Sequence, residues 1–248
     1  MSSDGKSATK FPKIHAALAQ AGFASRRKAE ALITAGQVTV NDQRAHIGQR
    51  VNPAQDIVKV EGKVIPLQAA KPYLLLINKP TGVVSTTHDE LGRPTVLDFL
   101  HQEVTKNDPD LAKELQAVRL YPVGRLDLDS EGLMLITNDG SLAQKLTHPS
   151  FESLKTYEVV VAGRPTFKAL NHLERGVRLK EGYTAPAEVN VIQTGTEQSI
   201  LEITIHEGRH QQVRRMCERV GYPVVRLTRT KMGPYSLDDL DGQSYKKI

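Results

Sequence analysis

The 248-residue sequence predicts an α+β fold, with a small N-terminal α/β domain followed by a larger domain built on a mixed or antiparallel sheet. Three observations support this. Short apolar runs typical of strands recur along the chain, with a few helical patterns between them. The positive charge is concentrated at one end. A stretch with a proline at each end, residues 66–72, is typical of a linker between two domains.

The domain boundaries follow from these patterns. Residues 1–10 are polar and we expect them to be disordered. Residues 11–65 form the small domain, residues 66–72 the linker and residues 73–248 the large domain.

Composition limits the class of protein. Hydrophobic residues make up 39% and charged residues 25%, as in an ordinary globular chain. No apolar run approaches the ~20 residues of a membrane span, and residues 1–10 lack the apolar core of a secretory signal. The single Cys217 excludes an internal disulfide and a multi-cysteine zinc site. We therefore expect a reduced, cytoplasmic protein without a membrane partner.

The whole net charge of +5 comes from residues 1–70. Residues 1–70 hold 10 Lys and Arg against 5 Asp and Glu, whereas the remaining residues hold 23 of each kind. A compact basic domain ahead of a neutral one is typical of an anchor for a polyanion.

In the small domain, Ile14, Leu18 and Ala21 mark one face of a short helix that ends at Gly22. Ser25 is a candidate N-cap for a second helix, which Gly36 ends. Residues 38–41 read as a strand entering a turn, and residues 51–60 and 63–65 as strands that finish the domain.

In the large domain, residues 73–78 predict a buried strand, which residues 83–86 continue. A helix begins at 96–100, and residues 107–120 read as a loop with a short helix. Further helices are expected at 141–146, 166–175 and 211–221, and further strands at 155–163, 189–192, 200–205 and 222–229.

The large domain is organised around residues 123–140, VGRLDLDSEGLMLITNDG. A tight turn carries Asp127, Asp129 and Glu131 directly ahead of the apolar run LMLIT, a core strand that ends at the turn signal Asn138-Asp139-Gly140. Such a turn holds a charged group rigidly at the edge of a site. On this window alone, a turn with solvated carboxylates remains the alternative.

Several motifs in order carry a resemblance. INKPTGVVST, GRPTVLDFL, GRLD with TNDG, KTY, and EGRHQQVRRM through RLTRTKMGP resemble the Rsu-type ribosomal RNA pseudouridine synthases. The order helix, SRR, helix, Gly-x-Val-x-Val-Asn over about residues 11–58 resembles the S-four-type RNA-binding domain. The final segment SLDDLDGQSYKKI departs from the usual close of the family.

The resemblance implies the fold and the reaction. It implies an S-four-type RNA-binding domain at 11–65 and a pseudouridine synthase catalytic domain at 73–248. The expected function is isomerisation of uridine in ribosomal RNA, large-subunit RNA first and small-subunit RNA second, on free RNA or a pre-ribosomal particle. We expect a monomer, no cofactor and no metal, since the product is an isomer and the sequence holds no phosphate loop, dinucleotide fingerprint or convincing metal-ligand set.

The resemblance also implies roles for residues. Asp127 is the catalytic carboxylate, paired with Arg214; Tyr157 lies against the flipped-out uracil. Leu227 lines the pocket and Arg125 helps to hold the nucleotide, with Arg209 and Arg215 as further substrate contacts. Because adjacent helix residues face different ways, only one of Arg214 and Arg215 points inward. The expected RNA contacts of the small domain are Ser25, Arg26, Arg27, Lys28 and Arg44, where a helix start also favours phosphate.

Two points stay open. The residues do not decide whether Asp127 attacks the sugar, attacks the base or assists departure of uracil. Two rival functions are a non-catalytic RNA-binding protein on the same fold and an aspartate-dependent hydrolase, which would need a second carboxylate such as Asp129 or Glu131.

Residues 206–231 carry seven Lys and Arg against Glu207 and Glu218, and predict a groove for RNA.

Overall fold

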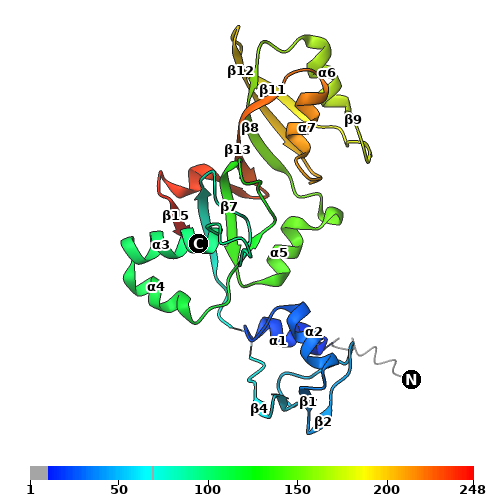
Figure 1. The fold of residues 1–248 in the computed structure, drawn as a ribbon, viewed down its shortest axis with the longest axis vertical. Coiled ribbons are helices and arrows are strands. Elements are labelled where there is room, and N and C mark those ends of the chain that lie inside the picture. Colours follow the sequence, from blue (N-terminus) through cyan, green and yellow to red (C-terminus); the bar gives the residue numbers. More distant parts are fainter. Residues whose placement is uncertain (1–10, 69) are drawn as a thin grey trace, which may run out of the picture. The chain divides into compact units, whose positions relative to one another are not determined.

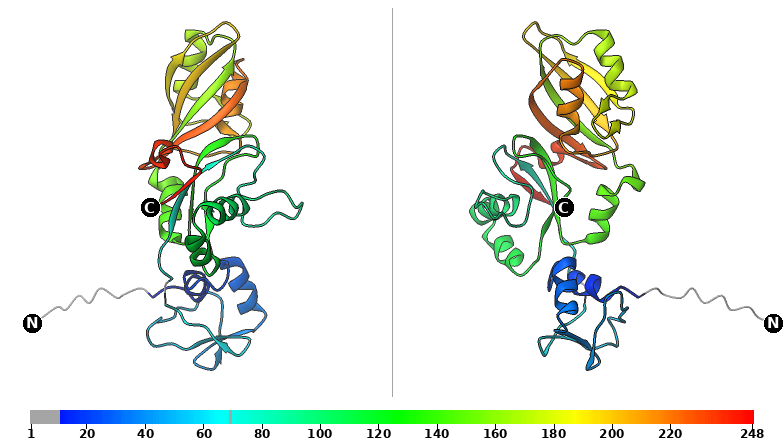
Figure 2. Two further views of the ribbon diagram at one scale, coloured as in Figure 1. Left: turned by 90° about the vertical axis from the view of Figure 1, so that its left-hand side faces the viewer. Right: turned by 45° about the vertical axis from the view of Figure 1, so that its right-hand side comes forward.

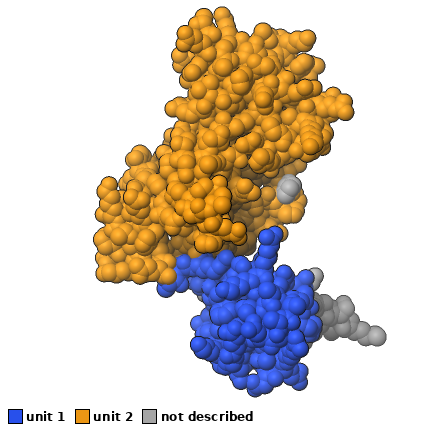
Figure 3. Space-filling view, in the orientation of Figure 1, with its two compact units in different colours: residues 1–72, 117–119 blue, residues 73–116, 120–248 orange. Residues whose placement is uncertain are grey.

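The structure is a computed structural model that describes residues 11–68 and 70–248 (Figure 1). The expectation of disorder at residues 1–10 lies outside the described part. The chain divides into two compact units, residues 1–72 with 117–119 and residues 73–116 with 120–248 (Figure 3).

The first unit packs two helices against a small antiparallel sheet. The helices are α1 (Ile14–Gln20) and α2 (Arg26–Thr34). The sheet has the order β2-β1-β3-β4, with bounds β1 (Val38–Val40), β2 (Gln43–Arg44), β3 (Val58–Val60) and β4 (Lys63–Val64). Ile14, Leu18 and Ile33 from the helices and Val38 and Val58 from the strands are at most 2% exposed, so one apolar core joins the layers.

The strand predicted at residues 51–60 is wrong over its first part, because β3 begins only at Val58. Pro53 has no N–H to give to a ladder. The Asp56 carboxylate accepts a hydrogen bond from the Asn52 N–H at 2.7 Å, which closes the segment into a turn.

The second unit is built on one mixed sheet with the order β11-β12-β8-β13-β7-β5-β15, with β6 added beside β7 and β14 beside β13. Strand β13 pairs in parallel with β7, and the other pairs are antiparallel. The α+β class with a mixed sheet is confirmed. The bounds are β5 (Leu74–Lys79), β6 (Tyr121–Val123), β7 (Glu131–Thr137), β8 (Lys155–Ala162), β11 (Glu188–Gln193), β12 (Gln198–Ile205), β13 (Val224–Met232), β14 (Tyr235–Ser236) and β15 (Tyr245–Lys247).

Helices cover this sheet in two groups, which Figures 1 and 2 show. α3 (Val96–Asn107) and α4 (Pro109–Gln116) lie beside the β5–β15 half, and α6 (Phe167–Arg175) and α7 (Gln212–Arg219) beside the β11–β13 half. α5 (Gly140–Thr147) follows β7, and a small hairpin of β9 (Arg178–Leu179) and β10 (Gly182–Tyr183) follows α6. The short helices η1 (Pro149–Phe151) and η2 (Leu237–Leu240) complete the unit.

Local sequence explains where these helices begin. The side chains of Thr95, Asp139 and Thr166 accept hydrogen bonds from backbone N–H groups in the first turns of α3, α5 and α6. At α3 the Asp98 carboxylate also accepts from the Thr95 N–H at 2.8 Å, which completes a capping box.

Residues 83–86 do not continue strand β5, contrary to the prediction. Pro80 interrupts the ladder, and in this segment only Val84 forms an isolated bridge, with Thr95. Within the described residues, no helix has the length and apolar character needed to cross a bilayer.

Candidate active site

The GRLD turn connects β6 with β7, and the segment after β5 holds its backbone. The Ser85 hydroxyl donates to the Leu126 carbonyl at 2.6 Å and accepts from the Leu126 N–H at 3.0 Å. The Gly82 N–H donates to the Leu128 carbonyl at 2.8 Å. Hydrogen bonds therefore join the INKPTGVVST segment to the backbone of the GRLD turn.

Lys79 fastens the same turn from within the fold. Its side chain is fully buried, and its Nζ donates to the carbonyls of Ser130 at 2.7 Å, Pro80 at 3.0 Å and Asp127 at 3.2 Å. Burial lowers the pKa of Lys79 to about 8, while the negative charge of Asp127 works in the opposite direction. Sequence reasoning did not assign Lys79 to the site, because a Lys-Pro pair after a strand is typical of an exposed turn.

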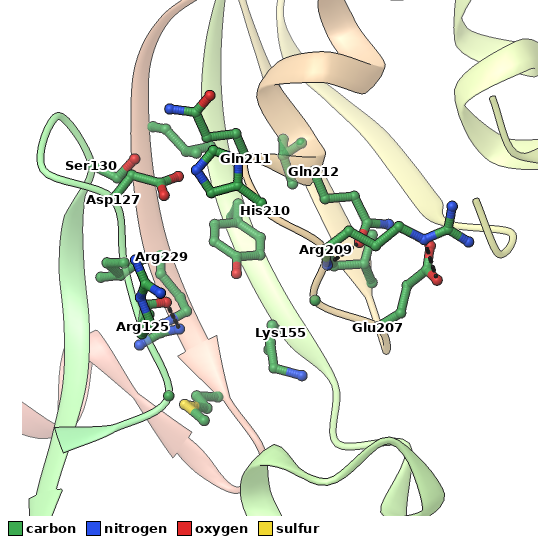
Figure 4. Close-up of a pocket in the computed structure, with 18 of the residues that line it drawn as sticks. Arg125, Asp127, Ser130, Lys155, Glu207, Arg209, His210, Gln211, Gln212 and Arg229 are labelled. Carbon is green, nitrogen blue, oxygen red and sulfur yellow. Dashed lines mark hydrogen bonds and ion pairs between the residues drawn. The ribbon is translucent and has the colours of Figure 1, made fainter. Parts of the chain in front are cut away.

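A pocket of about 390 Å³ lies beside this turn (Figure 4). Arg125 and Asp127 line it from the turn, Tyr157 from β8 and Leu227 from β13. Tyr157 is 8% exposed and Leu227 4% exposed, so the Tyr157 ring and the Leu227 methyl groups form walls of the pocket rather than part of the outer surface. The structure thus brings together four residues that the sequence assigned to the site from three separate motifs.

Strand register explains why Tyr157 and Leu227 meet. Tyr157 is paired with Arg229, and Val159 with Leu227, across the β8–β13 ladder. Side chains two apart on a strand share one face, so Tyr157, Leu227 and Arg229 lie on the same side of the sheet.

Arg229 is a second buried cation at the site. It is 1% exposed, lines the pocket, and donates from Nε to the Leu133 carbonyl at 2.8 Å and from Nη1 to the Arg125 carbonyl at 3.5 Å. The sequence places it in a basic cluster expected to contact RNA. In the structure, Arg229 is instead buried where β13 pairs with β7, and is not exposed on the surface.

Gly132 makes that junction possible. Its φ is +103°, and a Cβ there would lie 2.4 Å from the Arg229 carbonyl oxygen. Only glycine accepts both this backbone conformation and this close approach. The Gly of the GRLD-x-x-x-x-GL pattern thus allows β13 to pair beside the start of β7.

Arg214 contacts the turn but bonds to Asp129 rather than to Asp127. Its Nη2 lies 3.2 Å from the Asp129 carboxylate, and donates to the Asp129 carbonyl at 3.0 Å and the Ser130 hydroxyl at 3.2 Å. Across residues 11–68 and 70–248, the Asp127 carboxylate has no ion pair and accepts no hydrogen bond. The pairing implied by the resemblance is absent from this structure.

Arg209 and Arg215 bond to protein groups. Arg209 lines the pocket, but its guanidinium donates to the carbonyls of Gly182 at 3.1 Å and Tyr183 at 2.5 Å. Arg215 forms an ion pair with Glu181. Arg226 also forms an ion pair, with Glu158 at 3.0 Å. The groove for RNA over residues 206–231 stays a prediction.

In the first unit, Arg26, Arg27 and Lys28 are exposed at the start of α2, where the Ser25 hydroxyl accepts from the Lys28 N–H at 3.1 Å. Arg44 is exposed but lies over Gly36 and donates to the Thr34 carbonyl at 3.3 Å, at the end of α2. The predicted RNA contacts thus divide between the two ends of one helix.

In the second unit, the exposed His210 and the residue Gln211 line the pocket as well, and Gln211 has a left-handed φ of +50° (Figure 4). Among the described residues, no group of three His, Cys, Asp or Glu side chains is placed to hold a metal ion.

Comparison with known proteins follows the same division of the chain. The model of the family described as RNA pseudouridylate synthase matches residues 73–219, and the model of the S4 domain matches residues 13–58.

Individual relatives agree along most of their length. A ribosomal large subunit pseudouridine synthase B from Bacillus subtilis (strain 168) is 43% identical over 220 residues, covering 88% of this chain and 84% of the relative. A ribosomal large subunit pseudouridine synthase E from Vibrio vulnificus (strain CMCP6) is 41% identical over 196 residues, covering 73% and 77%. A crystal structure of a pseudouridylate synthase matches with a TM-score of 0.63 at 26% identity, covering 95% of both chains.

Proposed function

Because the chain belongs to the RNA pseudouridylate synthase family, we propose that it isomerises uridine to pseudouridine in ribosomal RNA, with Asp127 as the catalytic carboxylate. The relatives named for the large ribosomal subunit favour large-subunit RNA, and small-subunit RNA is the second candidate. The observation that carries the proposal is the Asp127 turn, whose backbone is bonded on both sides while its carboxylate lines the pocket unpaired.

The reaction requires this kind of group. The bond from ribose C1′ to uracil N1 breaks, the base turns, a new bond forms from C1′ to C5, and the proton lost from C5 is balanced by one gained at N1. A fixed carboxylate at the bond that breaks supports attack on the sugar, attack on the base, or departure of uracil.

The surrounding residues have distinct proposed roles. The target uridine leaves its stack to enter the pocket, and Tyr157 and Leu227 offer apolar contacts that offset the lost stacking. Arg125, exposed beside Asp127, holds the nucleotide at the rim. Arg214 acts on the turn as a positioning residue, through its bonds to Asp129 and Ser130.

The first unit supplies affinity in this proposal. Residues 11–65 are the RNA-binding domain, residues 66–72 the linker and residues 73–248 the catalytic domain. Arg26, Arg27 and Lys28 at the start of α2 bind phosphates, where the helix end adds favourable backbone N–H groups. The enzyme acts as a monomer in the cytoplasm, on ribosomal RNA or an assembling particle, without a cofactor.

Mapping pseudouridines in ribosomal RNA from cells with and without the gene tests the substrate. At least one position in large-subunit RNA should lose its modification, and re-expression of the gene should restore it. A change confined to small-subunit RNA would select the second candidate, and no change in either RNA would contradict the proposal.

Asp127→Asn tests the catalytic carboxylate. The amide keeps the shape but removes the negative charge, so pseudouridine formation should fall at least ~1,000-fold while RNA affinity is retained. Asp129→Asn is the matched control on the same turn, and should keep most of the activity. Substantial single-turnover product from purified Asp127→Asn would rule out the assignment.

A further inference from the structure

The β9–β10 hairpin, residues 178–183, is fastened to the wall of the pocket. Arg209 donates to the carbonyls of Gly182 and Tyr183, and Arg215 pairs with Glu181 at 2.5 Å. The Glu207 carboxylate accepts from the Ala185 N–H at 2.9 Å, directly after the hairpin. Arg209 and Glu207 also line the pocket, on the side away from Asp127 (Figure 4). The hairpin is therefore bonded to that wall at several points.

The hairpin has a buried and an exposed face. Val177, Leu179 and Thr184 are buried, whereas Arg178, Lys180 and Tyr183 point outward and are exposed. Tyr183 is 68% exposed and lies directly opposite Arg178 in the β9–β10 register. Within the described residues, the side chains of Arg178, Lys180 and Tyr183 have no hydrogen bond or ion pair.

This face combines a flat ring with two free cations. Glu181, the acidic residue of the hairpin, is paired with Arg215, so the outward charge is positive. A surface that binds a protein would typically have apolar residues around the tyrosine, whereas here Arg178 and Lys180 are its exposed neighbours. An aromatic ring beside free cations suits a base that stacks on the ring while its phosphates meet the cations.

We propose that the outer face of the β9–β10 hairpin is a second RNA contact, at which Tyr183 stacks on an unpaired base outside the pocket and Arg178 and Lys180 bind the adjoining phosphates. The inference rests on the proposed function, because it takes RNA as the substrate. It adds a site on the wall opposite the Asp127 turn. Arg209 and Arg215 serve it indirectly, by fixing the hairpin.

Binding of the full-length protein to protein-free ribosomal RNA, measured at several salt concentrations, tests the site independently of turnover. Tyr183→Ala should weaken binding about 5- to 150-fold, whereas Tyr183→Phe should keep the wild-type affinity because the ring remains. Arg178→Ala should reduce the slope of log affinity against log salt by about one. In turnover assays, the Tyr183→Ala loss should raise the RNA concentration needed for half-maximal rate.

Phe167→Ala is the matched control, since Phe167 is 81% exposed at the start of α6 and bonds to no pocket residue. It should leave RNA affinity within twofold of wild type. The inference is overturned if Tyr183→Ala also binds within twofold, or if Phe167→Ala weakens binding equally. A loss seen only on pre-ribosomal particles, with normal binding to protein-free RNA, would instead identify a protein partner. If wild type binds RNA through this face but forms no pseudouridine, the proposed function fails while the hairpin contact stands.

Discussion

Arg214 contacts the Asp127 turn without contacting the Asp127 carboxylate. A cation paired with a carboxylate favours its ionised form, so losing such a partner would raise the pKa of the carboxylate. Because Arg214 instead bonds to Asp129 and Ser130, we propose that it fixes the geometry of the turn.

Arg214→Met should therefore lower the single-turnover rate about tenfold, by the same factor at every pH between about 6.5 and 8.5. The variant removes two hydrogen bonds that hold the turn. Asp129→Asn, which keeps the acceptor carbonyl, should stay within about twofold of wild type. Recovery of Arg214→Met at high pH would show that Arg214 pairs with Asp127 in the working enzyme.

Lys79 should make the stability of the protein depend on pH, because burial lowers its pKa in the folded chain. The pKa of Lys79 is about 8 in the folded chain and near its ordinary value of 10.5 in the unfolded chain. Between these values the unfolded chain binds the extra proton, so the free energy of unfolding should rise with pH, by at most about 1.4 kcal/mol per unit. Below pH 8 both states are protonated and this contribution is constant.

Urea unfolding at about pH 7.5, 8.5 and 9.5 measures this slope, and Lys79→Met should remove it. The comparison with the variant isolates Lys79 from other groups that titrate in the same range. Parallel pH dependences for wild type and variant would contradict the assignment of the lowered pKa.

At the same scale, sequence reasoning found Asp127, Tyr157, Leu227 and Arg125, which line one pocket. It missed Lys79 and the burial of Arg229 because a lysine or arginine in a sequence reads as surface, and only the tertiary fold encloses it. It also could not show that Arg209 and Arg215 bond to the β9–β10 hairpin, since hydrogen-bond partners depend on how the loops fold.

At the scale of the element, the close approach of β7 and β13 depends on Gly132. Gly132→Ala should cost about 3 kcal/mol of unfolding free energy, because the added methyl group meets backbone atoms that cannot move freely. Gly221→Ala is the matched control, with a φ of +91° and open space around the site. It should cost only about 1–2 kcal/mol, from the backbone conformation alone. Equal losses in thermal or urea unfolding would show that the contact with β13 adds nothing.

Most elements were predictable from apolar periodicity, and the α+β class is confirmed. Strand order was not predictable, since β13 pairs with β8 on one side and β7 on the other across long stretches of sequence. The strands predicted at residues 51–57 and 83–86 are wrong. Apolar and β-branched residues favour strands, but near a proline their backbone groups can form hydrogen bonds in turns instead.

At the scale of the whole molecule, the membership in the RNA pseudouridylate synthase family confirms the resemblance drawn from the ordered motifs. That resemblance was strong because the motifs extend over both units. The motifs do not identify the uridine that is modified, because they describe the fold and the pocket rather than the RNA around the target.

The basic residues of the first unit give the last prediction. Replacing Arg26, Arg27 and Lys28 with alanine in the full chain should reduce the salt slope of RNA binding by about 2 to 3, one counterion per lost phosphate contact. These side chains are exposed, so the fold should be kept. Lys59→Ala, which removes a cation already paired with Asp42, should leave the slope unchanged. Identical slopes for the triple variant and wild type would exclude α2 as a phosphate contact.

The position of β13 in the sheet has a consequence for synthesis on the ribosome. The strand spans Val224–Met232, and the Arg229 side chain donates to the carbonyl of Leu133, which is made 96 residues earlier. A nascent chain that has not yet released this strand leaves β8 without its β13 partner, and an unpaired strand edge is a template for wrong pairing. Leu227 and Arg229 are also still missing from the pocket at that stage. The wall of the pocket therefore cannot be completed before residues 224–232 have left the ribosome, although the Asp127 turn on its other side is made far earlier.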